Sequence, residues 1–205
     1  MTSLSFTHRY EAALTEGLPP LLLLHGTGGN EDDLLPLGRA ISPGSALLSP
    51  RGKVLENGMP RFFRRLAEGV FDEDEVRMRA LELADFVVEA REAYGLGELT
   101  AVGFSNGANI AAAMLLLRPE SLAGGALLRA MVTLKNAPIP DLTGKRILLL
   151  SGASDPIITP DNAAQLAASL RDAKADVVAH TLPTGHGLTQ QDVTLTHQWM
   201  LNKRT

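Results

Sequence analysis

The stretch at residues 99–117, LTAVGFSNGANIAAAMLLL, decides how the rest of the chain is interpreted. It begins with a short apolar run of strand length, passes through GFSNG at 103–107, and ends in a segment rich in Ala, Met and Leu, which favour helix. Strand, Gly-x-Ser-x-Gly and helix in this order make a nucleophile elbow. The glycines lack a Cβ, so strand and helix can approach closely while Ser105 sits on a strained turn. This context favours an elbow over an ordinary glycine turn.

Length and composition indicate one soluble globular domain spanning residues 1–205. The net charge of −4 gives no broad basic field, so we expect neither nucleic acid nor anionic lipid as a partner. The chain has no cysteine, which excludes disulfides, thiolate zinc sites and a cysteine nucleophile. The first residues show no long apolar core or cleavage signature, and no run approaches the roughly 18 apolar residues of a membrane span. We therefore expect a cytoplasmic protein without membrane insertion.

Apolar runs of strand length alternate with helical patterns along the whole chain. We expect strands at 4–10, 21–24, 46–49, 99–102, 122–128, 146–150 and 177–182, and helices at 32–40, 72–94, 108–117, 160–173 and 188–203. This alternation predicts an α/β fold: a mainly parallel sheet of about seven strands, with helices on both faces and no large lid. Residues that directly follow the strands should then meet at the carboxyl edge of the sheet.

Ser105 needs a base in hydrogen-bond contact, because a neutral hydroxyl is a poor nucleophile. His186 is the leading candidate, since it lies between two glycines on a loop after the last strand. Asp155 follows a buried strand and is the candidate that orients this base. The order Ser, Asp, His distinguishes this triad from the other two known orders. A turn-capping Asp155 and a simple loop His186 are the alternatives.

The glycine-rich loop HGTGGN at 25–30 also follows a strand. It lacks the third glycine of a dinucleotide fingerprint and the Gly-Lys-Ser/Thr of a phosphate loop. The remaining use is an oxyanion hole, in which the backbone N–H of Thr27 faces that of Asn106 at the start of the elbow helix. His25 is expected to support this loop structurally. The acids at 72–75 read as a helix cap and first turn, so we expect no metal site there.

The substrate pocket is the least defined part of the sequence. Residues 50–65 are turn-rich and carry Phe62 and Phe63, which belong either to a satellite core or to a pocket wall. The loop at 129–140 offers Met131 and Leu134, and Ile157 lies two residues after Asp155. We name these five residues as pocket candidates.

Four segments together resemble the α/β-hydrolase superfamily, in particular the small carboxylesterase/phospholipase branch that includes acyl-protein thioesterase-like enzymes. They are LLLLHGTGGNEDDL at 21–34, GFSNGANIA at 103–111, SGASDPIIT at 151–159 and LPTGHGL at 182–188. The resemblance implies Ser105 as nucleophile, Asp155 as acid and His186 as base, with Thr27 and Asn106 as oxyanion donors and no metal or cofactor. Many relatives have Gln at position 106. The short stretch before residue 21 leaves room for about one strand, so the usual leading hairpin is expected to be trimmed.

The resulting functional hypothesis is a serine carboxylesterase that acts on small or medium esters through an acyl-enzyme. A lysophospholipase or acyl-protein thioesterase is an alternative within the same chemistry. A catalytically silent scaffold that binds a small ligand or a partner protein is the alternative from another class. The expected partner is a small-molecule ester, and a homodimer is left open.

Overall fold

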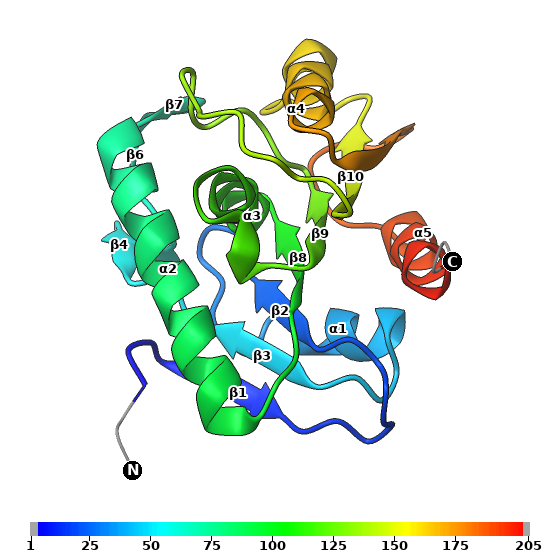
Figure 1. Ribbon diagram of the computed structural model, residues 1–205. Coiled ribbons are helices and arrows are strands. Elements are labelled where there is room, and N and C mark those ends of the chain that lie inside the picture. The colour runs from blue at the N-terminus through cyan, green and yellow to red at the C-terminus, as the bar shows by residue number, and fades with distance from the viewer. Residues whose placement is uncertain (1–3, 203–205) are drawn as a thin grey trace.

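Seven strands form one sheet in the order β1-β3-β2-β8-β9-β10-β11, seen in the computed structural model, which describes residues 4–202 (Figure 1). The strands are β1 (His8–Glu11), β2 (Leu21–Leu24), β3 (Leu47–Pro50), β8 (Thr100–Phe104), β9 (Gly124–Leu128), β10 (Arg146–Gly152) and β11 (Asp176–Leu182). Only the β1–β3 pairing in this sheet is antiparallel. The predicted mainly parallel sheet of about seven strands is confirmed, and between residue 4 and β2 the chain forms a single strand.

Helices cover both faces of this sheet (Figure 1). They are α1 (Leu35–Ile41), α2 (Glu73–Tyr94), α3 (Asn106–Leu117), α4 (Pro160–Asp172) and α5 (Gln190–Leu201), with a short 3-10 turn, η1 (Pro119–Ser121). Alternate residues of β2 divide between two cores: Leu22 and Leu24 pack with α2, α3 and α4, whereas Leu21 and Leu23 pack with α1 and α5. A strand buried on both faces explains the unbroken apolar run in the sequence. None of the helices within residues 4–202 is long and apolar enough to cross a membrane.

Residues 54–71 form two small hairpins, whereas the sequence predicts only that residues 50–65 are rich in turns. β4 (Val54–Glu56) pairs with β5 (Met59–Arg61), and β6 (Arg65–Ala67) pairs with β7 (Val70–Phe71), both antiparallel. The first hairpin turns at Asn57-Gly58, where both residues have positive φ, 52° and 80°. Asn-Gly is the preferred pair for such a two-residue turn, so this signal was present in the sequence.

Helices α2 and α4 each begin directly after a residue whose side chain caps the helix. The Asp72 side chain accepts a hydrogen bond from the N–H of Glu75 at the start of α2, and Thr159 caps α4 in the same way. The helix expected from residue 32 starts later than predicted, beyond a local turn made by Asn30. Its side chain accepts from the N–H of Asp32 in a local turn, and α1 begins only at Leu35.

Candidate active site

Ser105 lies on a sharp turn between β8 and α3. Its backbone has φ 51° and ψ −115°, a sparsely populated conformation for a residue with a side chain. Positions 103 and 107 must be glycine, because there is no room for a Cβ at either of them. A Cβ on Gly103 would lie 2.5 Å from the carbonyl oxygen of Gly107, and one on Gly107 would lie 1.9 Å from that of Leu24. The N–H of Ser105 donates to the carbonyl of Leu128 on β9 over 2.9 Å, which ties the turn to the sheet.

The side chains of Ser105, His186 and Asp155 form a continuous hydrogen-bonded chain. Nε2 of His186 lies 2.9 Å from Oγ of Ser105, and Nδ1 lies 2.8 Å from Oδ2 of Asp155. With the Nδ1 proton donated to the carboxylate, Nε2 is left as an acceptor for the serine hydroxyl. The three residues follow β8, β11 and β10, so the carboxyl edge of the sheet brings them together.

The Asp155 carboxylate is held in place by its own loop. Its side chain is 1% exposed, and Oδ1 accepts from the N–H groups of Ile157 (2.8 Å) and Ile158 (3.1 Å). These bonds leave Oδ2 for the imidazole of His186. The His186 side chain is 21% exposed, so the central residue of these three hydrogen-bonded side chains borders solvent. The carboxylate is therefore oriented by backbone and the imidazole by the carboxylate.

Thr27 and Asn106 border the same cavity as Ser105. Within residues 4–202, neither backbone N–H donates to a backbone carbonyl. Asn106 is the first residue of α3, where such free N–H groups are expected. Thr27 is held by its side chain, whose Oγ1 accepts from Nη1 of Arg61 over 2.7 Å. The two amides predicted as oxyanion donors thus remain free beside the serine.

The cavity beside Ser105 has a volume of about 200 Å³. One part of its lining is apolar, and another part is formed by charged residues of the hairpins. The lining residues are Thr27, Arg61, Arg65, Glu68, Gly69, Phe71, Phe104, Ser105, Asn106, Asn109, Met131, Ile157, Ile158 and His186. Two of the five pocket candidates, Met131 and Ile157, are therefore at the cavity.

The prediction that Phe62, Phe63 and Leu134 line the pocket is wrong. All three are buried in the larger core, which contains α2 and α3. The Phe62 ring packs against the ring of His25, with centroids 4.7 Å apart. Phe71 and Phe104 supply the aromatic lining instead. The sequence offers a signal for Phe104, because this residue directly precedes Ser105.

Arg61 is the main polar residue that the sequence reasoning missed. It is 3% exposed, yet it lines the cavity, and its Nε donates to the carbonyl of Phe63 over 3.1 Å. Burial lowers the pKa of this guanidinium from its ordinary value, while the Glu56 carboxylate 3.3 Å away acts in the opposite direction. Its position on a short hairpin strand, with Thr27 as partner, carries no sequence motif.

Two asparagines of α3 connect the elbow helix to the loops around the cavity. Oδ1 of Asn106 accepts from the N–H of Phe62 over 2.7 Å, and Oδ1 of Asn109 accepts from the N–H of Met131 over 2.8 Å. Nδ2 of Asn106 is buried without a partner among the described residues. The helix that begins directly after Ser105 therefore also holds the segments at residues 62 and 131 in place beside the cavity.

His25 supports the glycine-rich loop, as the sequence predicts. Its Nδ1 lies 2.7 Å from the carbonyl oxygen of Gly26, and Nε2 accepts from the N–H of Gly52 over 2.9 Å. Burial lowers its pKa, which favours the neutral ring that these two bonds require. Within residues 4–202, no three His, Cys, Asp or Glu side chains gather where they could hold a metal ion.

Comparison with known proteins shows the family to which this chain is similar. A family model described as alpha/beta hydrolase fold matches residues 19–144, more than half of the chain. MhqD of Bacillus subtilis (strain 168) is 45% identical over 194 residues, covering 94% of this chain and 96% of MhqD.

Two solved carboxylesterases are similar in both sequence and structure. The Bacillus cereus carboxylesterase is 42% identical with a TM-score of 0.93, covering 96% of this chain and 93% of that one. The carboxylesterase from Mesorhizobium loti is 34% identical, also with a TM-score of 0.93, covering 99% of this chain and 98% of that one. The similarity in each case extends over nearly the whole of both chains.

Proposed function

Because the chain belongs to the α/β hydrolase fold family, we propose that it is a serine hydrolase that cleaves small carboxylic esters through an acyl-enzyme on Ser105. The observation that carries this proposal is the hydrogen-bonded chain from Ser105 through His186 to Asp155. Its similarity to the two carboxylesterases supports the ester bond as the target.

In the proposed reaction, His186 Nε2 takes the hydroxyl proton of Ser105 as Oγ attacks the ester carbonyl carbon. The carbonyl electron pair moves to its oxygen, and the N–H groups of Thr27 and Asn106 bind that oxyanion. Collapse of the tetrahedral intermediate expels the alcohol, which receives the proton from His186. Water then attacks the acyl-enzyme with His186 as base, releasing the acid and restoring Ser105.

The cavity supports a small ester as substrate. Its volume of about 200 Å³ is below the roughly 300–1,000 Å³ of typical pockets for drug-sized ligands. Phe71, Met131 and Ile158 provide apolar contact for a short acyl or alcohol group. Arg61 and Arg65 add donors that would bind oxygen atoms of the substrate.

The test is hydrolysis of a p-nitrophenyl ester series, from acetate to long acyl chains, beside a thioester and a lysophospholipid. We expect the short esters to react fastest and Ser105→Ala to abolish the reaction while the fold is retained. Ser154→Ala is the matched control, because this exposed serine neighbours Asp155 but does not line the cavity. Preference for the thioester or lysolipid would favour the alternative enzyme class. A wild-type protein inactive on the whole set would favour a silent binding scaffold.

A further inference from the structure

Arg129 holds the loop that carries His186 from both sides. It follows β9, and its side chain is fully buried. Nε donates to the carbonyl oxygen of Gly185 and Nη2 donates to that of Gly187, each over 3.1 Å. These two glycines are the residues directly before and after the imidazole. One guanidinium therefore fixes the backbone on both sides of His186.

The same residue connects this loop to the other two segments of the site. The N–H of Arg129 donates to the carbonyl of Leu150 over 2.8 Å, and Nη1 reaches the same oxygen over 3.2 Å. Leu150 lies on β10, the strand that leads to Asp155. The preceding residue, Leu128, accepts from the N–H of Ser105. Residues 128 and 129 thus contact the segments of the nucleophile, the acid and the base.

Asp192 completes the environment of the guanidinium. Its Oδ1 accepts from Nη1 of Arg129 over 2.8 Å and its Oδ2 accepts from Nη2 over 2.9 Å, with both side chains 0% exposed. Oδ2 also accepts from the N–H and Oγ1 of Thr189 at the start of α5. With the carbonyls of Gly185, Gly187 and Leu150, the carboxylate provides one acceptor for each of the five N–H donors of arginine.

Stability alone does not account for this arrangement. Replacing a buried ion pair by apolar residues of similar volume is often neutral or stabilising. Arg129 also has φ 58°, a left-handed conformation that costs free energy for any residue with a Cβ. Arg129 therefore carries both an unfavourable backbone conformation and a buried charge, and two of its N–H donors bind the His186 loop.

We propose that Arg129 is a positioning residue that fixes the His186 imidazole between Ser105 and Asp155. This inference rests on the proposed function, in which His186 is the base. The planar fork of arginine can bind the carbonyls on both sides of the loop, whereas a lysine has a single nitrogen and must leave some of the five acceptors unpaired. The test is therefore the conservative variant Arg129→Lys, which keeps the buried positive charge opposite Asp192.

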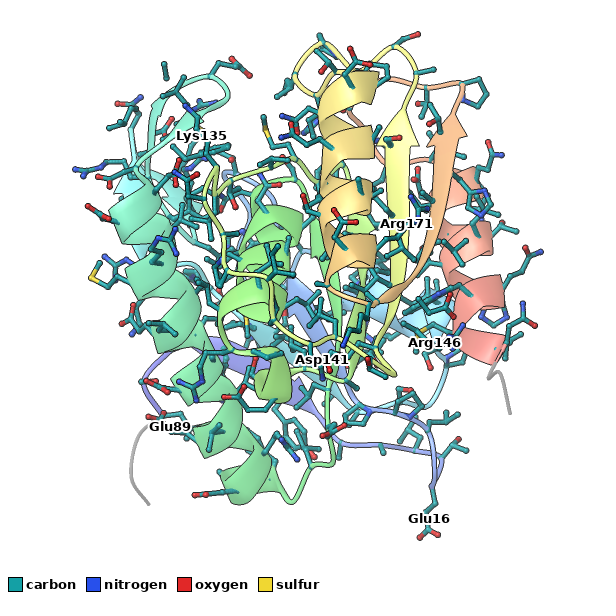
Figure 2. All side chains as sticks on the ribbon, turned by 45° about the horizontal axis from the view of Figure 1, so that its top comes forward. Glu16, Glu89, Lys135, Asp141, Arg146 and Arg171 are labelled. Atoms are coloured by element: carbon teal, nitrogen blue, oxygen red, sulfur yellow. The ribbon has the colours of Figure 1, made fainter. Side chains whose placement is uncertain are left out.

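The matched control is Arg146→Lys at the other end of α5. Figure 2 shows Arg146 beside that helix, where its guanidinium donates to the carbonyl of Trp199 over 2.9 Å and stacks on its ring. It begins β10, so the length of this strand separates it from the Asp155 loop. This control changes an arginine that also contacts α5 without touching the His186 loop.

For Arg129→Lys we expect kcat on a short p-nitrophenyl ester to fall about 10- to 100-fold with KM changed by less than about threefold, because a misplaced base slows the chemical step. The downfield proton resonance of the His186–Asp155 hydrogen bond should broaden or disappear. Arg146→Lys should keep both the wild-type kcat and the resonance. A folded Arg129→Lys protein with wild-type kcat and an unchanged resonance would overturn the proposal.

A second variant keeps the test decisive if Arg129→Lys does not fold. The double variant Arg129→Met/Asp192→Leu removes both buried charges, so we expect a folded protein with the same loss of kcat. Wild-type kcat in this variant would also overturn the positioning role. Failure of the proposed function looks different, because the wild-type protein itself would then have no esterase activity to lose.

Discussion

The two walls of the cavity are built in different ways. The wall that carries Ser105, Asp155 and His186 consists of loops at the ends of parallel strands, and β2, β8, β9 and β10 are almost entirely buried. The opposite wall consists of two short hairpins whose strands expose Leu55 (69%) and Leu66 (65%). Core packing fixes the strands before Ser105 and Asp155, and the buried Arg129 holds the His186 loop after the largely exposed edge strand β11. The second wall depends on a few local contacts.

The hairpin wall is linked by charged pairs. Nε of Arg65 donates to Glu56 over 2.7 Å, and Arg64, whose side chain is 57% exposed, pairs with Asp72. An ion pair this exposed contributes little to stability, because water screens the attraction between its charges. The buried Arg61 is the exception, because it connects its hairpin to Thr27. The comparison teaches that the proposed chemistry depends on the sheet wall, and we expect the hairpin wall to tolerate changes that alter substrate choice at little cost in stability.

The largest effect should come from a minimal change on the sheet wall, Asp155→Asn. The amide NH₂ would replace the oxygen that faces Nδ1 of His186, so the imidazole would adopt the tautomer that cannot accept the Ser105 proton. We expect kcat on a short p-nitrophenyl ester to fall by about 10³- to 10⁴-fold. The exposed Asp161 in the first turn of α4 provides the control Asp161→Asn, with unchanged kcat. A loss smaller than about tenfold would show that Asp155 is not the orienting acid.

A smaller effect is expected on the hairpin wall from Arg61→Met. The change removes the donor to Thr27 Oγ1 and frees the segment that offers the Thr27 N–H. We expect kcat/KM to fall about tenfold, the equivalent of ~1.4 kcal/mol. Arg64→Met, on the exposed side of the same segment, should stay within about twofold of wild type. If Arg61→Met kept a kcat/KM as close to wild type as Arg64→Met, the hairpin wall would not support the site.

The smallest effect should be a change in stability with pH caused by His25, which connects the glycine-rich loop to Gly52 just before the first hairpin. Protonation of Nε2 would break the bond from the N–H of Gly52, and burial lowers the pKa of His25 below its ordinary value of 6.5. The unfolded chain therefore binds a proton at a higher pH than the folded one. The stabilising contribution is present above pH 6.5 and is lost as the pH falls below it.

This pH dependence can be measured by urea unfolding at about pH 7.5 and about pH 5.5. We expect wild-type stability to fall between these values by more than that of His25→Gln, which has no proton to bind. His197→Gln is the control, because it removes a half-buried histidine on α5, away from the cavity. Identical pH dependence of His25→Gln and wild type would contradict the neutral, buried role of His25.

The sequence predicts the sheet wall well for a physical reason. Buried parallel strands appear as unbroken apolar runs, and their carboxyl ends converge, so residues such as Ser105 and Asp155 can be placed without knowing the loop conformations. The family resemblance inferred from these segments is confirmed.

The hairpin wall could not be placed in this way. Which side chain of a short strand faces the cavity depends on the turn at Asn57-Gly58 and on contacts with distant residues. The sequence makes Phe62 a pocket candidate because it is aromatic and near a turn, but its N–H is held by Asn106 and its ring lies in the core. Its neighbour Arg61 reaches the cavity instead. No periodic pattern in this segment distinguishes the two positions.

The most direct test of the central claim is labelling of the folded wild-type protein with a fluorophosphonate, followed by peptide mass spectrometry. We predict one adduct per chain, located on Ser105, and a much slower reaction in His186→Ala, because the hydroxyl then lacks its base. A folded protein that stays unlabelled, or that carries its adduct on another residue, would contradict the account.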